Sequence, residues 1–524
     1  MIHSIQLKDL NLGKIDAKNE LIDSTEEAKR EFLDSFLAPE NFVLDDFVNH
    51  KKFYILGFKG IGKTALLHYM DLRIQKEFRN STSHFILFKS EIKEDDFGKV
   101  GSASNSVVVG LNHEQKYEGN RYSDIWRWFL YRQISSLAYN ELKKGTPIFN
   151  DDKAWRSFYT CVSLLNTKDS LWSSLFPKVK RGSVKIEGDF KVLKANLGID
   201  LEWENIDERR IKFSNLVSTA DSLFKELKPT GRNVYLFIDE LEVSFTTKKQ
   251  YDRDVQLIRD LVLTVYQIHI EIRRLNYPIR IIVAIRSEVQ NAAKAIGQEM
   301  NKPLFDFGLN LKWQQSGGDL DNHPLIKMIN KRINSSERKL GLEPSDPDTL
   351  WKKYFPPSIN NQKAKEYILR RTWYRPRDVV RLLNLCKEQY PNEVKFTHQV
   401  FDGINKDYSS QSWNEMTEEL STTYSPEEID GIKRMLMGIP GAFTYKDVKE
   451  RNDILKELYP SVDRLLKKHS PNDILEKLYA IGIIGNTGGS VRYAFRGDDV
   501  LILTNKMKVH DPLWNYLSVQ RPEK

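Results

Sequence analysis

The sequence predicts an α/β fold built around a parallel sheet, followed by a helical region and a small C-terminal domain. Three observations lead to this prediction. A glycine-rich segment, residues 57–64, lies between an apolar run and a helix-forming stretch. Two more apolar runs, residues 233–240 and 280–286, end in charged residues, as buried parallel strands do where a sheet binds its ligands. Near the C-terminus a helix-forming stretch precedes short strand-like runs.

Length and composition limit the classes of protein that fit. At 524 residues the chain is too long for one core, and ordinary domain sizes predict about three domains. Its 40% hydrophobic and 29% charged residues are typical of a globular protein. The two cysteines, Cys161 and Cys386, show no metal-ligand spacing and suit a reducing compartment. No signal peptide is evident, and no apolar run approaches the ~20 residues of a membrane helix, so we expect a cytoplasmic protein without a membrane role.

Residues 57–64 read Gly-Phe-Lys-Gly-Ile-Gly-Lys-Thr, the full pattern of a P-loop. The glycines allow backbone N–H groups to surround a triphosphate, and the positive end of the following helix favours an anion. Lys63 is expected to reach the β- and γ-phosphates, and the Thr64 hydroxyl to bind Mg²⁺. An ordinary glycine-rich turn before a helix is the alternative. The predicted nucleotide-binding residues in this segment are Gly57, Lys59, Gly60, Ile61, Gly62, Lys63, Thr64 and Ala65.

The apolar run that begins at Asn233 ends in two adjacent carboxylates, Asp239 and Glu240. In the Walker B role, Asp239 would hold Mg²⁺ through water, and Glu240 would polarise the attacking water. The alternative is an acidic cap after a core strand. With Lys63, Glu240 is a predicted catalytic residue, and Asp239 and Thr64 are the predicted metal ligands.

The other elements are predicted in chain order. Residues 1–50 form an N-terminal lead-in with a helix at 24–36, and the nucleotide core covers 51–320. The aromatic residues near 126–129 are expected to lie in the core rather than to stack on bases. The remaining expected elements are core strands at 53–56, 84–88, 280–285 and 305–313, helices ending near 78 and at 124–142 and 251–275, a polar loop at 91–122, a hairpin at 183–190 and 196–203, and a mixed α/β insertion at about 91–205.

Beyond the core, Pro376 is expected to open a helix, within a helical lid at 321–411. The last part, 412–524, begins with helices, and its helix 472–479 and strand 491–496 fit a winged-helix pattern. That helix carries Asp473 and Glu476 against only Lys477, which favours contact with protein over docking on DNA phosphates.

The net charge of +8 is concentrated in one segment. From His323 to Val400 there are 16 Lys and Arg against 8 Asp and Glu, and the difference, 16 − 8 = +8, equals that of the whole chain. Such a segment suits nucleic acid, an acidic partner or the nucleotide itself. A solvated helical surface is the alternative.

With these motifs in this order, the chain resembles a bacterial AAA+/STAND-type ATPase over about 51–90, 206–385 and 412–515. It is similar to the wider group that includes origin-recognition-like ATPases and ATPases of phage defence. The long insertion before Asp239 resembles that of KAP-type ATPases, whose transmembrane helices are absent from this sequence. The fold implied is a P-loop ATPase core with a mixed α/β insertion, a helical lid and a C-terminal winged-helix domain.

The resemblance also implies two arginine roles, a γ-phosphate sensor and a lid arginine, whereas the sequence does not give the source of an arginine finger. Arg286, at the tip of its strand, stands where these ATPases sense the γ-phosphate, and it is the third predicted catalytic residue, although pairing with Glu288 is an alternative. Arg377 matches the lid arginine that reaches back to the phosphates, and Arg375 is the second candidate for this role. Ordinary surface arginines would look the same. Arg332 is a candidate for an arginine finger.

The expected function is that of an ATP-hydrolysing regulatory switch with ATP and Mg²⁺, part of a bacterial phage-defence system. No effector motif is present in the sequence, so we expect a separate effector protein, and the resemblance favours a homo-oligomer. Two alternatives stay open. One is a DNA-associated initiator or loader, with nucleic acid as the partner. The other is a non-enzymatic scaffold that the nucleotide stabilises.

Overall fold

The computed structural model describes residues 5–23, 25–88, 122–163, 183–185, 203–205, 210–241, 248–287, 300–313, 319–421, 423–488, 490–496 and 500–519. The chain forms two compact units. We call Asn41–Phe58 with Met70–Leu311 the sheet unit. Met1–Glu40, Lys59–Tyr69 and Lys312–Lys524 make up the helical unit. The predicted N-terminal lead-in is therefore divided, with its first 40 residues in the helical unit and the rest in the sheet unit.

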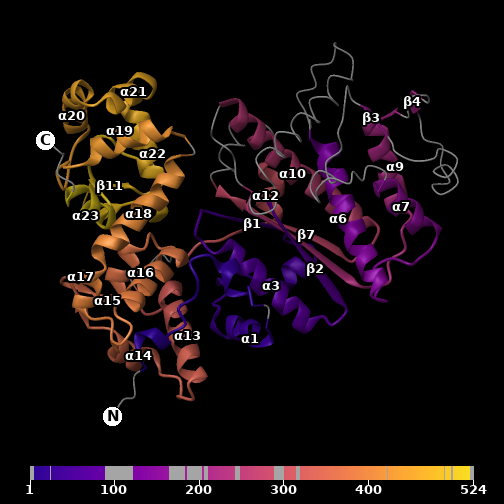
Figure 1. The fold of residues 1–524 in the computed structure, drawn as a ribbon, viewed down its shortest axis with the longest axis horizontal. Coiled ribbons are helices and arrows are strands. Elements are labelled where there is room, and N and C mark those ends of the chain that lie inside the picture. The colour runs from indigo at the N-terminus through magenta and orange to yellow at the C-terminus, as the bar shows by residue number, and fades with distance from the viewer. Residues whose placement is uncertain are drawn as a thin grey trace. The chain divides into compact units, whose positions relative to one another are not determined.

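A five-stranded parallel sheet forms the centre of the sheet unit, as predicted, in the order β2-β6-β7-β1-β8 (Figure 1). Its strands are β1 (Tyr54–Gly57), β2 (Ser81–Leu87), β6 (Asn233–Asp239), β7 (Ile279–Arg286) and β8 (Gly308–Asn310). The side chains of β1 and all but the first of β6 are buried, which explains why the sequence carries continuous apolar runs there instead of an alternating pattern.

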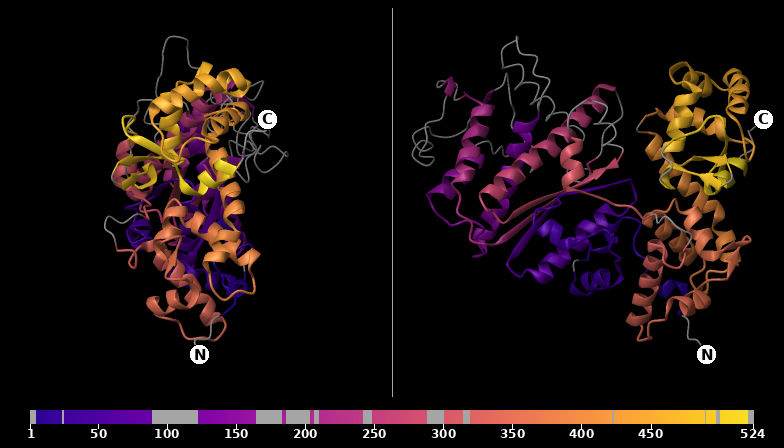
Figure 2. Two further views of the ribbon diagram at one scale, coloured as in Figure 1. Left: turned by 90° about the vertical axis from the view of Figure 1, so that its left-hand side faces the viewer. Right: turned by 180° about the vertical axis from the view of Figure 1, so that it is seen from behind.

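Helices cover both faces of this sheet. Figures 1 and 2 show α6 and α10 on one face and α3 on the other. The indole N–H of Trp126 donates to the Leu257 carbonyl, and Trp128 is fully buried, so the expectation that these aromatics lie in the core is confirmed. The helices are α2 (Leu44–Val48), α3 (Lys63–Glu77, whose first turns belong to the helical unit), α6 (Ser123–Lys143), α7 (Lys153–Ser163), α9 (Phe213–Lys225), α10 (Lys248–Arg274) and α12 (Asn301–Phe307).

The predicted strand at 305–313 is wrong over its first part. Residues up to Phe307 belong to helix α12, and only Gly308–Asn310 form a strand. Met300 and Leu304 are buried and Phe307 packs against the same core, whereas Phe305 is 86% exposed. Apolar residues at 300, 304 and 307 have the spacing of one helix face, and this pattern overrides the apparent alternation of Phe305 and Phe307.

Only the outer ends of the predicted hairpin, residues 183–185 and 203, lie within the described residues, and they are not partners of each other. The strands β3 (Ser183–Lys185) and β4 (Trp203–Asn205) do not pair with each other, because β5 (Arg210–Lys212) lies between them and pairs antiparallel with both. Residues 186–202, and 91–121 of the predicted polar loop, lie outside the described residues. The described part of the predicted insertion is not a separate body, since α6 and α7 share the core of the large sheet.

The helical unit begins with the N-terminal segment packed on later helices. Leu7 donates its N–H to the Glu393 carbonyl at 2.7 Å, and α1 contacts α13. The elements up to the middle of this unit are the 3₁₀ turns η1 (Leu7–Asp9) and η2 (Ala17–Glu20), α1 (Glu26–Ser35), α13 (Pro324–Lys339), α14 (Pro347–Tyr354), β9 (Ser358–Ile359), β10 (Gln362–Lys363), α15 (Ala364–Arg371), α16 (Pro376–Gln389), α17 (His398–Gly403) and α18 (Asn405–Leu420).

The C-terminal part combines helices with a three-stranded antiparallel sheet in the order β12-β11-β13 (Figure 2). The predicted strand 491–496 is only half right, because β12 ends at Arg492 and residues 494–496 form a 3₁₀ turn. Helix α18 runs across the predicted boundary at residue 412. The elements are α19 (Pro426–Leu436), α20 (Tyr445–Leu458), α21 (Pro460–Lys468), α22 (Pro471–Ala480), β11 (Ile484–Gly488), β12 (Ser490–Arg492), η3 (Ala494–Arg496), β13 (Lys506–Val509) and α23 (Asp511–Val519).

Among the helices that the structure describes, none combines the length and the apolar character that crossing a membrane requires.

Candidate functional site

Three predicted site residues lie at the C-terminal ends of neighbouring strands in the sheet unit. Gly57 ends β1, Arg286 ends β7, and the two residues are register partners. Asp239 ends β6, on the other side of β7. Strand β7 thus lies between the strand that leads into the glycine-rich loop and the strand that ends in the acidic pair. This edge of a parallel sheet is where α/β proteins bind ligands.

Glu240 follows β6 with an unusual backbone. Its φ is 60°, in the left-handed region that glutamate seldom adopts. Its N–H donates to Asp239 Oδ1 at 2.7 Å, and Asp239 is only 4% exposed. The chain therefore turns sharply at the strand end, and Asp239 is buried whereas Glu240 is only half-buried. Strained backbone of this kind is concentrated at functional sites.

The glycine-rich loop continues in the helical unit, where its backbone explains the glycines. Gly60 has φ of 75° and Gly62 has φ of 97°, conformations that disfavour any residue with a Cβ. Helix α3 then starts at Lys63, which is only 8% exposed, and Thr64 and Ala65 are half-buried in the same first turn. The orphan N–H groups of this first turn offer hydrogen bonds to an anion.

Within the helical unit the loop contacts the start of α16, the helix that Pro376 opens as predicted. The Arg377 N–H donates to the Gly60 carbonyl at 3.3 Å, and a Cβ at Gly60 would lie 3.3 Å from the Cβ of Arg377. The indole N–H of Trp313 donates to the Ile61 carbonyl at 2.7 Å. The structure thus brings the backbone of Arg377 to the loop and fixes two loop carbonyls, while its reach to the phosphates stays a prediction.

An acidic group on α18 meets the basic residues around the loop. Glu415 lies 3.3 Å from the Lys59 ammonium and 3.9 Å from the Arg377 guanidinium, and Glu418 also pairs with Lys59. Arg375, the second predicted lid arginine, is buried and donates to Glu419 at 3.1 Å. We call Glu415, Glu418 and Glu419 the α18 carboxylates. They give Lys59 and both arginines anionic partners within the protein itself.

Glu415 has three cationic neighbours, Lys59, Arg377 and Arg381. Burial alone would raise its pKa, but the positive charges of Lys59, Arg377 and Arg381 together lower the pKa below the usual range of a glutamate. Arg381, whose guanidinium lies 3.9 Å from Glu415, is held by Asp378 at 2.8 Å. Glu415 is therefore ionised at neutral pH and shared among three cations.

Sequence reasoning missed the α18 carboxylates and Trp313. The glutamates stand more than 350 positions from Lys59, and nothing in the local pattern of α18 marks them, because acidic residues on a helix surface are ordinary. Arg332, the arginine-finger candidate, is buried at 6% exposure and pairs with Glu20 at 3.2 Å. Arg332 therefore does not present the exposed guanidinium with which a finger would reach a neighbouring subunit.

Comparison with known proteins gives one finding for part of the chain. Residues 323–417 match a family described as the FunZ-associated C-terminal helical domain. The match covers Arg375, Arg377 and Glu415, whereas Trp313 and Glu418, which also contact the loop, lie outside it. No curated protein matches the chain.

Proposed function

We propose that this protein binds ATP with Mg²⁺ at the loop 57–65 and hydrolyses it. The observation that carries the proposal is the conformation of the loop. It follows a central parallel strand, turns through two glycines with positive φ, and leads without interruption into the N-terminus of a 15-residue helix. An ordinary turn before a helix needs neither the glycines nor a buried Lys63 at the first helical position.

The chemistry of the available groups fits a triphosphate and its magnesium ion. Lys63 supplies a positive charge, and the first turn of α3 supplies N–H donors. Thr64 would hold the metal with its hydroxyl, and Asp239 through water, both with the oxygen atoms that Mg²⁺ prefers. The ion would neutralise charge that develops on the phosphate oxygens.

The roles of the other residues follow from their positions. Glu240, held in a strained turn beside Asp239, accepts a hydrogen bond from the attacking water and orients it. Arg286, level with Gly57 on the adjacent strand, senses the terminal phosphate. Arg377 contributes a second positive charge from the start of α16.

The experiment that tests the proposal is direct. Calorimetry of the full chain with ATP and, separately, GTP in the presence of Mg²⁺ should register binding of at least ATP, and phosphate release should depend on Mg²⁺. If neither nucleotide gives heat at saturating concentration, the proposed site does not exist. Binding without any turnover would instead support the alternative in which the nucleotide is a structural ligand.

We also propose that hydrolysis serves a regulatory switch. The contacts between the loop and the region that matches the FunZ-associated helical domain support this role. Loss of the terminal phosphate would remove negative charge near Arg377 and so change the strength of the ion pair between Arg377 and Glu415. In this proposal the helical region acts as an AAA+/STAND-type lid, and the C-terminal helices and three-stranded sheet act as a winged-helix-like protein-contact domain. The partner is a separate effector protein of a bacterial phage-defence system, and the chain works as a homo-oligomer in the cytoplasm.

Replacing Glu415 with glutamine should strengthen ATP binding. The carboxylate neutralises Lys59 and Arg377, so its removal takes a negative charge away from both cations, although Lys59 keeps its pair with Glu418. The dissociation constant should fall roughly two- to fivefold, the size of a partly exposed charge contact. Glu388→Gln, an exposed change on α16, is the matched control and should leave the affinity unaltered. Weaker ATP binding by Glu415→Gln than by the control would show that the glutamate supports the nucleotide instead of competing with it.

The DNA-associated alternative has less support. Most basic side chains of the segment 323–400 bond to acids or carbonyls within the helical unit, so they are not available to phosphates. Helix α22 begins with Asp473 and also carries Glu476. The absence of any shift with single-stranded or duplex DNA at low salt, where phosphate contacts are strongest, would remove this alternative.

A further inference from the structure

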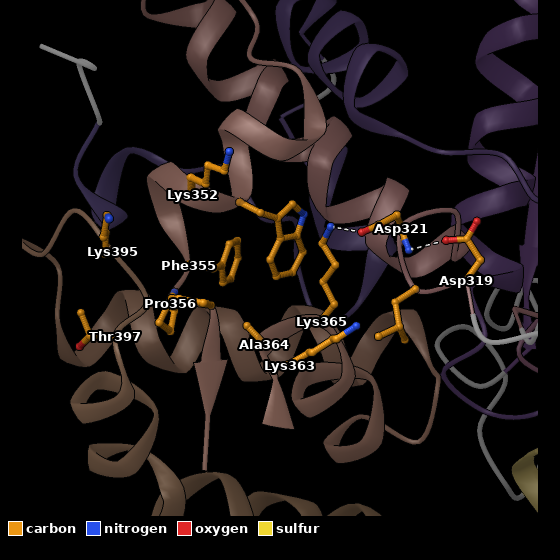
Figure 3. Close-up of a pocket in the computed structure, with 13 residues that line it drawn as sticks. Asp319, Asp321, Lys352, Phe355, Pro356, Lys363, Ala364, Lys365, Lys395 and Thr397 are labelled. Atoms are coloured by element: carbon orange, nitrogen blue, oxygen red, sulfur yellow. Dashed lines mark hydrogen bonds and ion pairs between the residues drawn. The ribbon is translucent and has the colours of Figure 1, made fainter. Parts of the chain in front are cut away.

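A cavity of about 740 Å³ lies in the helical unit between α14 and α15 (Figure 3). Its apolar lining includes Trp351, Phe355, Pro356, Pro357 and Ala364. The Trp351 and Phe355 rings stack with centroids 4.1 Å apart, and the Trp351 indole N–H donates to Asn330 at 2.7 Å, so both contacts hold the Trp351 ring in place. The volume is in the range of small-molecule sites, which are about 300–1,000 Å³.

Four lysines surround the apolar lining. Figure 3 shows Lys352, Lys363, Lys365 and Lys395 distributed around Phe355. Lys365 is already engaged, because its ammonium pairs with Asp321 and lies 5.0 Å from the centroid of the Trp351 ring. The other three lysines are exposed.

The two acids at the cavity do not balance these three lysines. Asp321 pairs with Lys365, while Asp319 accepts from the Asn322 amide at 2.6 Å and from two backbone N–H groups. Their carboxylates are thus satisfied by other partners. The cavity keeps a surplus of positive charge beside an apolar surface.

The distribution of partners within the basic segment singles out this cavity. Of the 16 Lys and Arg between residues 323 and 400, all but three have a side-chain hydrogen bond or ion pair to a described residue. The three for which the described part of the chain supplies no such bond are Lys352, Lys363 and Lys395, and all three line the cavity. Within the described residues, the basic side chains of this segment that have no such bond are therefore all at this cavity.

We propose that this cavity is a second ligand site, separate from the glycine-rich loop, for a small organic phosphate in which phosphate groups adjoin an apolar or aromatic body. The lysines bind the phosphates as point charges, and the apolar lining takes the body of the ligand. Phosphate and ammonium form charge-assisted hydrogen bonds, which are stronger than neutral ones.

The geometry favours a small ligand over a nucleic-acid strand. Proteins that bind single strands offer exposed aromatic faces on which successive bases stack. Here Phe355 is 2% exposed and Trp351 is 7% exposed, so the two rings belong to the wall of the cavity and do not stand out from the surface as a platform for successive bases. The acids at one end of the cavity, Asp319 and Asp321, also oppose a phosphate backbone continuing in that direction.

The test measures binding of two probes to the full chain by calorimetry without Mg²⁺. They are the 5′-phosphorylated dinucleotide pApA and 1-naphthyl phosphate, which share the proposed chemistry but differ in body. The test variant is Lys352→Gln/Lys363→Gln/Lys395→Gln. Its control, Lys406→Gln/Lys446→Gln/Lys449→Gln, removes the same charge from exposed lysines that do not line the cavity. All six positions are exposed, so neither variant disturbs the core.

At least one probe should bind the wild type. The test variant should weaken that binding about tenfold or more, whereas the control should not change it. Lys63→Ala should leave probe binding unchanged, which separates this site from the proposed ATP site. Failure of both probes to bind would overturn the proposal. So would equal binding by both triple variants, or pyrophosphate binding as tightly as the probes, since the apolar lining would then contribute nothing. Loss of hexaglutamate or duplex DNA binding in the test variant, with probe binding intact, would assign the lysines to a macromolecular partner and also overturn it.

Discussion

Lys63→Ala is expected to remove most of the ATP affinity. Lys63 is only 8% exposed and begins α3, so its side chain is largely removed from water at the end of the loop. Truncating one partner of a desolvated charge pair weakens binding by about 2 kcal/mol or more, which corresponds to at least roughly 30-fold in the dissociation constant. Titration of the full chain with ATP and Mg²⁺ measures the effect.

The control is Lys76→Ala, an exposed lysine in the last turn of the same helix. Alanine has the highest helix propensity, so both variants keep α3 intact, and their thermal unfolding should stay close to that of the wild type. Equal ATP affinity for wild type and Lys63→Ala would show that the loop does not bind phosphate. Lower affinity in both variants would point to general damage to the helix.

Glu240→Gln is expected to separate binding from chemistry. The amide keeps the shape of the side chain but cannot accept a proton, so ATP affinity should be retained while turnover falls about 100- to 10,000-fold, the usual contribution of a general base. Phosphate release under saturating ATP gives the turnover, and calorimetry gives the affinity. Glu226→Gln, an exposed change in the same unit, is the control and should behave like the wild type. Undiminished hydrolysis by Glu240→Gln would exclude Glu240 from the reaction.

The backbone at Glu240 allows a second readout of the same residue. Because φ is 60°, glycine fits this position without the penalty of a Cβ. Glu240→Gly should therefore be as inactive as Glu240→Gln, yet relief of the strain, about 1 kcal/mol, should offset part of the destabilisation expected from an added glycine. A variant that loses both activity and several degrees of thermal stability would show that the glutamate has a structural role instead.

The sequence predicts the central sheet well because burial on both faces requires continuous apolar runs. Such runs predict the strands that end in Gly57, Asp239 and Arg286, and all three strands are confirmed. The same logic was wrong at Phe305, where two phenylalanines two positions apart mimic a strand but belong to a helix. Pattern alone could not distinguish these cases, because the burial of Met300 and Leu304 decides the outcome.

Much of the candidate site could not be predicted for a different reason. The glycines of the loop are visible in the sequence because their chemistry is local. The α18 carboxylates and the lysines of the cavity are brought to their places by tertiary packing, and nothing in the sequence around each of them marks it. The strain at Glu240 is equally hidden, because no rule of local sequence places a glutamate in the left-handed region.

The ion pairs of Glu415 connect α18 with the glycine-rich loop and with the start of α16. A carboxylate that neutralises Lys59 and Arg377 acts as a built-in counter-ion, and a polyphosphate bound at the loop, as we propose, would have to exchange with it. Arrival of the nucleotide and release of α18 would then be one ion-exchange step. Such a step needs no elastic deformation of the sheet. Because ion pairs weaken as salt rises, the nucleotide concentration at which Glu415 on α18 separates from Lys59 and Arg377 would depend on ionic strength.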